Sequence, residues 1–179
     1  NSGSANLTGN HSMNVYEARG TSGWLLDASG NDAVTLVGGS NNDTLTGGSG
    51  NDTLTGVGGT DRFNVTGGTD SILDLSGSDA LVVSASATAN ATVTANWTAT
   101  ADSTNAGTAT LTGNFNMDLN LAGGAQGWTV DASGNNSVTL VGSGHNDTLT
   151  GGHGNDSIDG GNGRDAVHYA GDRNDYDIS

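Results

Sequence analysis

Aspartates recur at intervals of nine residues in two blocks of the sequence, with glycine-rich segments between them. The aspartates are Asp43, Asp52, Asp61, Asp70 and Asp79 in the first block and Asp147, Asp156 and Asp165 in the second. Glycine-rich loops bring backbone carbonyl oxygens close to such carboxylates. Oxygen ligands suit a hard divalent cation, and Ca²⁺ accepts irregular sets of roughly six to eight oxygens more readily than Mg²⁺ does. The spacing therefore predicts a row of calcium sites.

An apolar residue follows each of these aspartates by two positions, as Leu45 follows Asp43 and Ile158 follows Asp156. The repeated unit reads Gly-Gly-x-Gly-x-Asp-x-U-x, where U is apolar. Glycines permit a left-handed backbone, so the first six residues can form a loop that the aspartate closes. The last three form a short strand whose middle side chain points inward. Asn41 and His145 replace glycine at the fourth place, and both residue types tolerate positive φ. Loops alternating with short strands must therefore position the aspartates.

This nonapeptide resembles the calcium-binding repeats of the repeats-in-toxin (RTX, hemolysin-type) family of secreted bacterial proteins. The resemblance implies an all-β fold, a right-handed parallel β-roll or β-helix solenoid with calcium between its turns. Two nonapeptides would then make one turn, so residues 18 positions apart stack. Asp43 would lie over Asp61, Asp52 over Asp70, Asp61 over Asp79, and Asp147 over Asp165. We therefore expect about four well-formed calcium sites and an incomplete one at Asp156.

The expected metal-binding residues are the aspartates and the loop residues before them. In the first block they are Gly38, Gly39, Asn41, Asp43, Gly47, Gly48, Gly50, Asp52, Gly56, Gly58, Asp61, Gly67, Gly68, Asp70 and Asp79. In the second block they are Gly142, Gly144, Asp147, Gly151, Gly152, Gly154, Asp156, Gly160, Gly161, Gly163 and Asp165. No catalytic or organic-cofactor residues are expected.

A longer duplication, with an offset of 104 residues, relates the two blocks. Trp24 recurs as Trp128, and the segment 27–31 (Asp-Ala-Ser-Gly-Asn) recurs as 131–135. We expect a first module at 1–110, with its calcium roll at 38–82 and alternating strands at 83–110. A second, incomplete module at 111–179 would have β-rungs at 111–141, a calcium roll at 142–168 and a capping tail at 169–179. The chain therefore reads as part of a tandem array.

The segments outside the nonapeptides also alternate between apolar and polar residues. From Val83 to Ala101 every odd position is apolar, which predicts strand. Such a run is too long for one strand, so we expect it to bend. Alternation resumes at 109–121, with Phe115 and Leu121 among the apolar positions. We interpret these segments as metal-free rungs continuing the same solenoid, an interpretation that antiparallel strands in 111–141 would refute.

Composition excludes several classes of protein. The chain has 19 acidic residues against 4 basic ones, a net charge of −15, so it offers no basic surface to nucleic acid. It has no cysteine for disulfides or thiolate metal sites, and no apolar run long enough for a membrane span. Neither H-E-x-x-H nor G-x-S-x-G occurs, and Glu17 is the only glutamate. We therefore expect no enzymatic activity.

Several residues leave alternatives open. Trp24 and Trp128 suit the core of the repeat better than ligand stacking, and Asp27 and Asp131 suit Asx-type turns better than an extra ion site. His145 and His153 lack the spacing of a zinc site and suit substitutions in calcium loops. The end of the chain resembles the segment that follows RTX repeats and would cap the roll with Tyr169, Tyr176 and Ile178.

Three functions remain open from the sequence. The first is a structural or adhesive array, rigidified by calcium, in a large adhesin, surface layer or matrix filament. The second is a calcium-triggered folding and secretion module of a toxin or exoenzyme. The third is a carbohydrate-binding surface with exposed aromatic residues. Calcium is the expected cofactor, and neighbouring copies of the module, and glycans in the third case, are the expected partners. The family resemblance implies type I secretion to the extracellular space or cell surface.

Overall fold

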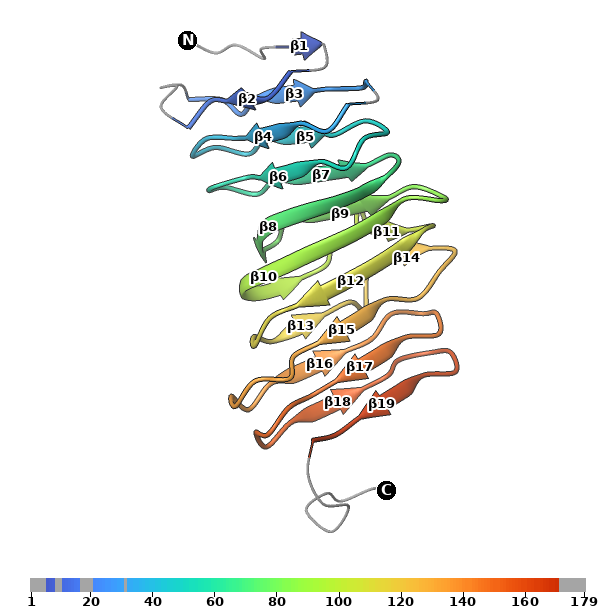
Figure 1. The fold of residues 1–179 in the computed structure, drawn as a ribbon. Coiled ribbons are helices and arrows are strands. Elements are labelled where there is room, and N and C mark those ends of the chain that lie inside the picture. Colours follow the sequence, from blue (N-terminus) through green and yellow to red (C-terminus); the bar gives the residue numbers. More distant parts are fainter. Residues whose placement is uncertain (1–5, 9–10, 17–20, 31, 171–179) are drawn as a thin grey trace.

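A computed structural model describes residues 6–8, 11–16, 21–30 and 32–170. The described chain coils into a stack of short parallel strands and contains no helix (Figure 1). The strands of the first half are β1 (Asn6–Thr8), β2 (Met13–Asn14), β3 (Leu25–Asp27), β4 (Thr35–Val37), β5 (Thr44–Thr46), β6 (Thr53–Thr55), β7 (Arg62–Val65), β8 (Thr69–Gly77) and β9 (Ala80–Val83). Those of the second half are β10 (Thr88–Thr98), β11 (Thr104–Asn105), β12 (Thr108–Thr112), β13 (Met117–Asp118), β14 (Gly123–Gly124), β15 (Thr129–Asp131), β16 (Thr139–Val141), β17 (Thr148–Thr150), β18 (Ser157–Asp159) and β19 (Ala166–His168).

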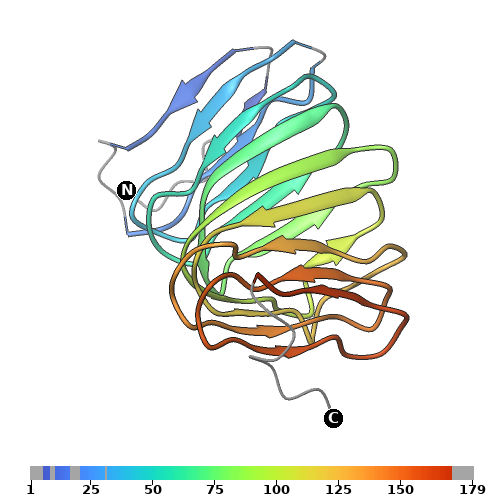
Figure 2. The same ribbon diagram turned by 60° about the horizontal axis from the view of Figure 1, so that its bottom comes forward.

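The strands form two sheets that face each other across the interior (Figure 2). One sheet runs β1-β3-β5-β7-β9-β11-β14, and the other runs β19-β17-β15-β12-β10-β8-β6-β4-β2 with β13, β16 and β18 beside it. Every pairing between described strands is parallel, as a solenoid requires. The expected all-β, parallel β-roll architecture is confirmed. No described helix is long and apolar enough to cross a membrane.

Each strand of the first calcium-roll segment places at least one apolar side chain in the interior. In one sheet Leu45 pairs with Phe63, and Phe63 pairs with Leu81. In the other sheet Leu54 pairs with Ile72. All five side chains are fully buried. The predicted stacking of residues 18 positions apart is therefore confirmed in both sheets.

The alternating segment 83–101 bends, as expected, and enters the solenoid mainly as the long strand β10. The chain turns before β10, where Ser86 has a φ of 66°, and again after it at Thr100 and Ser103. Trp97 of β10 packs inside the coil against Trp128, with ring centroids 6.2 Å apart. The alternation does not hold throughout: Ala85 and Ala101 lie in turns, Ala95 lies in β10 where the pairing with β8 shifts in register between Val93 and Trp97, and all three are exposed.

Parallel rungs continue through residues 111–141. Strand β12 pairs with β15 and β13 pairs with β16, both in parallel, so the interpretation as continuing solenoid is confirmed. Two apolar expectations are wrong: Phe115 and Leu121 are 37% and 60% exposed, because each lies in a loop beside β13 rather than in a strand. The boundary expected at 110/111 falls inside β12, and the division into two modules stays a prediction.

At the C-terminal end, β19 pairs with β17. Tyr169, expected in the cap, is 39% exposed. The other two expected capping residues, Tyr176 and Ile178, lie outside the described residues. The capping role of the tail therefore stays a prediction.

Candidate metal centre

Of the eight aspartates that recur every nine residues, seven lie in loops that lead into the strands, and Asp70 is the second residue of β8. Six of the eight are almost fully buried: Asp43, Asp52, Asp61, Asp70, Asp79 and Asp147, with exposures of 0–4%. Asp156 and Asp165 are partly exposed. Carboxylates are rarely buried unless they are paired or bound to a metal, so this row needs a physical explanation.

Hydrogen bonds connect each aspartate to the turn before it. The Oδ1 atom of Asp61 accepts the N–H of Asp43 at 2.8 Å, and Asp79 Oδ1 accepts the N–H of Asp61 at 2.8 Å. Asp70 Oδ1 accepts the N–H of Asp52 at 3.0 Å. In the second block, Asp165 Oδ1 accepts the N–H of Asp147 at 2.9 Å. The four expected pairs are therefore stacked as predicted.

The first aspartate of each column bonds to a different kind of residue. Asp43 Oδ1 accepts the N–H of Trp24, and 104 residues later Asp147 Oδ1 accepts that of Trp128, at 2.6 and 2.7 Å. Likewise Asp52 accepts from Val34 and Asp156 from Val138, at 2.9 and 3.0 Å. The duplication seen in the sequence is thus repeated in the hydrogen bonds of the loops.

The second carboxylate oxygen separates the aspartates into two groups. In three of them Oδ2 accepts a nearby N–H: from Gly39 to Asp43 at 2.5 Å, from Ser143 to Asp147 at 2.6 Å and from Ser76 to Asp79 at 2.9 Å. In three others, namely Asp52, Asp70 and Asp156, Oδ2 is buried without any partner. A buried anionic oxygen without a donor is costly, and a bound cation would remove that cost.

The expected incomplete site at Asp156 stays a prediction. The N–H of Val138, its expected neighbour, donates to Oδ1, and Oδ2 is buried and unpartnered like those of Asp52 and Asp70. Asp156 thus begins a column on a backbone N–H, without an aspartate above it. Its expected later neighbour, Asn174, lies outside the described residues.

In six of the eight loops the first residue is a glycine that gives the aspartate room. A Cβ built on Gly38, Gly47 or Gly56 would lie 2.4, 2.3 or 2.1 Å from Oδ2 of the aspartate in the same loop. The same holds in the second block at Gly142, Gly151 and Gly160, at 2.8, 2.5 and 2.5 Å. Any side chain at these places would push into the carboxylate, so the loop requires glycine there.

The other expected loop glycines serve backbone packing or turning. Gly50 and Gly154 lie against carbonyl groups of the preceding turn, at Asp32 and Asn136. Left-handed φ occurs at the second place in Gly48 and Gly161 and at the fourth place in Gly59, Gly68, Gly77 and Gly163. Gly58 and Gly67, at the third place, lie over Ser40 and Ser49 of the preceding turn. The remaining expected glycines are Gly39 and Gly152 at the second place and Gly144 at the third.

Asn41 and His145 replace glycine at the fourth place of the nonapeptide, and the expectation that they do so by adopting positive φ is wrong. Among the described non-glycine residues only Val57 and Ser86 have positive φ, so neither Asn41 nor His145 uses the left-handed region. His145 instead directs its ring toward the previous turn, with Nε2 at 2.8 Å from the Gly124 carbonyl oxygen. The loop there is shaped by a side-chain contact rather than by the backbone.

Burial and like charge make the bare carboxylates unfavourable. Burial, with a smaller contribution from the neighbouring Asp79, Asp43 and Asp74, raises the pKa of Asp61 to about 7. Burial also raises the pKa of Asp70 to about 7, with Asp52 adding to the shift. The pKa values of Asp52 and Asp79 are raised for the same main reason, burial. A cation between the stacked carboxylates would favour their ionised form.

The fifth loop departs from the nonapeptide and contains a residue that the sequence analysis missed. Asp79 closes a tight turn in which its own N–H donates to the Ser76 carbonyl at 3.1 Å. Asp74 stands at the first place of this nonapeptide, and its carboxylate accepts the N–H groups of Gly56 and Val57 at 3.0 and 2.7 Å. An acidic residue at a glycine position was the signal that could have identified it.

The donor set fits a calcium ion. In the part of the chain that the structure describes, no three His, Cys, Asp or Glu side chains converge on one point. Stacked pairs of carboxylates together with loop carbonyls are instead the available ligands, an all-oxygen set that suits a hard cation. The residues that would hold it are the four stacked aspartate pairs and the loops that carry them.

The structure distinguishes between the alternatives that the sequence left open for two tryptophans and two aspartates. Trp128 is 1% exposed and Trp24 is half-buried against the core, so both are core residues, as expected. Asp131 forms the expected Asx turn, accepting the N–H of Ser133 at 3.0 Å. Asp27 does not repeat this contact, since its Oδ1 is buried without a partner.

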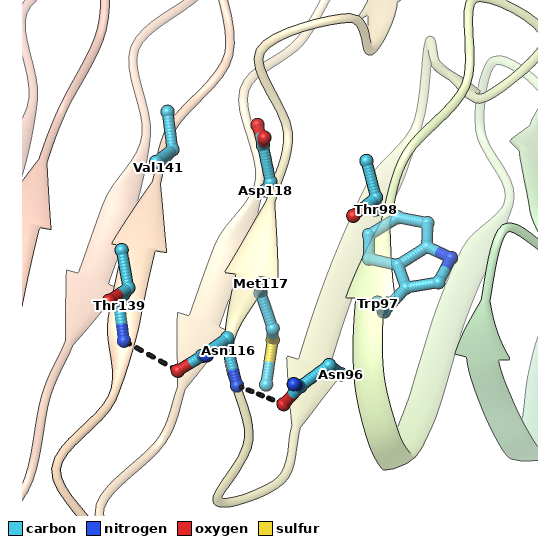
Figure 3. Close-up of a pocket in the computed structure, with 8 residues that line it drawn as sticks. All are labelled: Asn96, Trp97, Thr98, Asn116, Met117, Asp118, Thr139 and Val141. Atoms are coloured by element: carbon cyan, nitrogen blue, oxygen red, sulfur yellow. Dashed lines mark hydrogen bonds between the residues drawn. The ribbon is translucent and has the colours of Figure 1, made fainter.

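A separate groove of about 340 Å³ lies on the outer face of β10, β13 and β16 (Figure 3). Asn96 Oδ1 accepts the N–H of Asn116 at 3.1 Å, and Asn116 Oδ1 accepts that of Thr139 at 2.8 Å. The side chains thus form a ladder along the sheet. Asp118 is the only titratable residue in the lining, so the groove brings together no catalytic group of residues.

Comparison with known families identifies the loops. The family model for the RTX calcium-binding nonapeptide repeat matches in four copies, over residues 28–63, 37–72 and 139–167. No curated protein and no solved structure matches the chain. The matched ranges include every aspartate of the nine-residue repeat except Asp79, whose loop also differs in geometry from the other loops.

Proposed function

Because the chain belongs to the RTX calcium-binding nonapeptide repeat family through residues 28–72 and 139–167, we propose that it is a calcium-stabilised structural segment of a secreted or cell-surface protein. Its role is to form a rigid solenoid when calcium binds, as part of an adhesin, surface layer or matrix filament. Type I secretion delivers it to the outside of the cell, where calcium is abundant, and neighbouring copies of the module continue the array. No catalytic role is assigned to it.

The observation that carries the proposal is the set of buried, unpartnered Oδ2 atoms of Asp52, Asp70 and Asp156. Proteins satisfy nearly all their buried polar atoms, so three such atoms in equivalent places require a common partner. The partner must be a cation, because the atoms belong to carboxylates in columns of like charge. We assign about four ions to the pairs Asp43–Asp61, Asp61–Asp79, Asp52–Asp70 and Asp147–Asp165.

The array role rests on the duplication. Equivalent loops 104 residues apart repeat the same hydrogen bonds, from Trp24 to Asp43 and from Trp128 to Asp147. A continuous parallel ladder joins the two blocks through β10 and β12, so rigidity in one block is transmitted to the other. A carbohydrate-binding surface is less well supported, since Trp97 and Trp128 are buried and Trp24 is half-buried against the core.

Calcium-dependent folding tests the proposal. Far-UV circular dichroism and thermal unfolding of the chain are compared in calcium, in magnesium and in excess chelator. We expect more strand structure and a higher melting temperature in calcium than in magnesium or chelator, because binding to the folded form adds stability. The triple variant D52N/D70N/D156N should lose part of the calcium response. An unchanged melting temperature in chelator would refute the proposal.

A further inference from the structure

Asp74 holds a loop that lies one full turn before it. Its Oδ1 accepts the N–H of Gly56 at 3.0 Å, and its Oδ2 accepts the N–H of Val57 at 2.7 Å. Gly56 begins the loop that ends at Asp61. Two consecutive backbone N–H groups that face one carboxylate form an anion-binding nest. The carboxylate therefore fixes the start of the loop.

The backbone at Val57 explains why this contact is needed. Val57 has a φ of 80°, in the left-handed region that β-branched residues strongly disfavour. Its counterpart 104 residues later is Gly161, with a nearly identical φ of 81°. Gly48, at the same place in the preceding loop, is also left-handed, so here the chain places a valine where two equivalent loops have glycine. The two hydrogen bonds to Asp74 hold Val57 in the conformation that glycine adopts freely.

The same contact changes the surroundings of Asp61. In two other loops the second-place N–H donates to the aspartate of its own loop, from Gly39 to Asp43 and from Ser143 to Asp147. In the loop of Asp61 that N–H belongs to Val57 and donates to Asp74. Oδ2 of Asp61 therefore differs from Oδ2 of Asp43 and Asp147 and receives no N–H from its own loop, as in the loops of Asp52, Asp70 and Asp156.

We infer that Asp74 is a positioning residue, which preforms the loop 56–61 for the cation and leaves the second oxygen of Asp61 available to it. The inference rests on the calcium binding proposed above. Asp61 is the middle member of the column Asp43–Asp61–Asp79, so a preformed loop here serves the ions on both sides. Asp74 also adds negative charge: burial is the main cause of the raised pKa values of Asp61 and Asp79, and Asp74 contributes to both.

A double-mutant cycle separates positioning from charge. Calcium titrations by calorimetry compare the full chain with D74N, V57G and D74N/V57G. D74N should weaken part of the calcium binding by about tenfold, as loss of a group that orients a metal ligand does. V57G should raise affinity more in the D74N background than in the original chain, because glycine needs no support at positive φ. D102N removes an exposed charge outside the nonapeptide loops and should leave calcium affinity unchanged.

Other results of these titrations would contradict either the positioning role of Asp74 or the proposed calcium binding. Equal effects of V57G in both backgrounds would mean that Asp74 acts only by charge or as a direct ligand, and the positioning role would be wrong. Unchanged affinity in D74N would also overturn it. A chain that takes up no calcium would overturn the proposed function together with this inference, and the titration of the unmutated chain distinguishes that case.

Discussion

Replacing Asp61 by asparagine should destabilise the protein in calcium but not in chelator. Asparagine has nearly the same shape and keeps an oxygen that can accept the Asp43 N–H, now made at 2.8 Å. Its own backbone N–H can still donate to Asp79 at 2.8 Å. The substitution therefore removes charge while leaving the stacking contacts in place.

The magnitude follows from the position of Asp61 in two stacked pairs. A site held at about a hundred times its dissociation constant contributes about 2.7 kcal/mol to stability, so losing two sites costs about 5 kcal/mol in calcium. That is a large part of the stability of an ordinary domain. In chelator the sign should reverse, because the variant removes a buried carboxylate whose pKa burial raises to about 7.

Urea unfolding followed by circular dichroism, at pH 8 in calcium and in chelator, measures both effects. D52N, which removes one member of a single stacked pair, should lose about half as much stability in calcium. D102N provides the control for charge alone. If D61N loses the same stability in calcium and in chelator, Asp61 acts through hydrogen bonding, and the reasoning from bridged carboxylates is wrong.

Two further predictions concern the metal-free chain and the loop glycines. In chelator, the free energy of unfolding should fall as the pH rises from about 4 through about 7. Asp61 and Asp70 keep their protons up to about pH 7 in the folded chain, because their folded pKa values are about 7, whereas the unfolded chain releases them near 3.8. The stabilisation is therefore complete below the unfolded pKa and lost above the folded pKa. Stability curves against pH test this, and a flat or rising curve would contradict it. Gly142→Ala should destabilise the protein by about 2 kcal/mol, since its Cβ would lie 2.2 Å from the Gly160 carbonyl oxygen. Gly144→Ala, whose Cβ would have nothing within 4 Å, should be nearly neutral. Equal shifts of the melting temperature in the two variants would show that steric room for a Cβ in the loop does not determine stability.

The calcium-roll segments could be predicted from the sequence because their signal is periodic. A fixed phase of nine places the apolar residues Leu45, Phe63 and Leu81 in one column, and the same phase places the aspartates in another. Stacking depends only on this phase and on the length of a turn. The continuing rungs at 111–141 were predictable for a similar reason, since alternation marks strand and the duplication ties them to the first module.

What could not be predicted depends on contacts rather than on period. Phe115 and Leu121 fit the alternation but lie in loops, and no local pattern marks where a short strand ends. The left-handed backbone at Val57 contradicts the preference of its residue type and is held by Asp74, 17 positions away. Residue preference alone placed the left-handed conformation at Asn41 and His145, which do not adopt it.

The repeated Asp-Ala-Ser-Gly-Asn segment explains how a column of calcium loops begins. The N–H of Ser49, in the loop of Asp52, donates to the Gly30 carbonyl at 2.9 Å, and 104 residues later that of His153 donates to the Gly134 carbonyl at 2.9 Å. Each segment is thus a turn on which the next loop rests.

Asp52 and Asp156, in the loops that rest on these turns, both have an unpartnered Oδ2. The residue stacked on each of them in the preceding turn is a valine, Val34 or Val138, which donates a backbone N–H but has no carboxylate to share an ion. The first loop must therefore share its cation with the loop that follows it. Folding induced by calcium consequently begins at these turns and extends toward the C-terminus of each block.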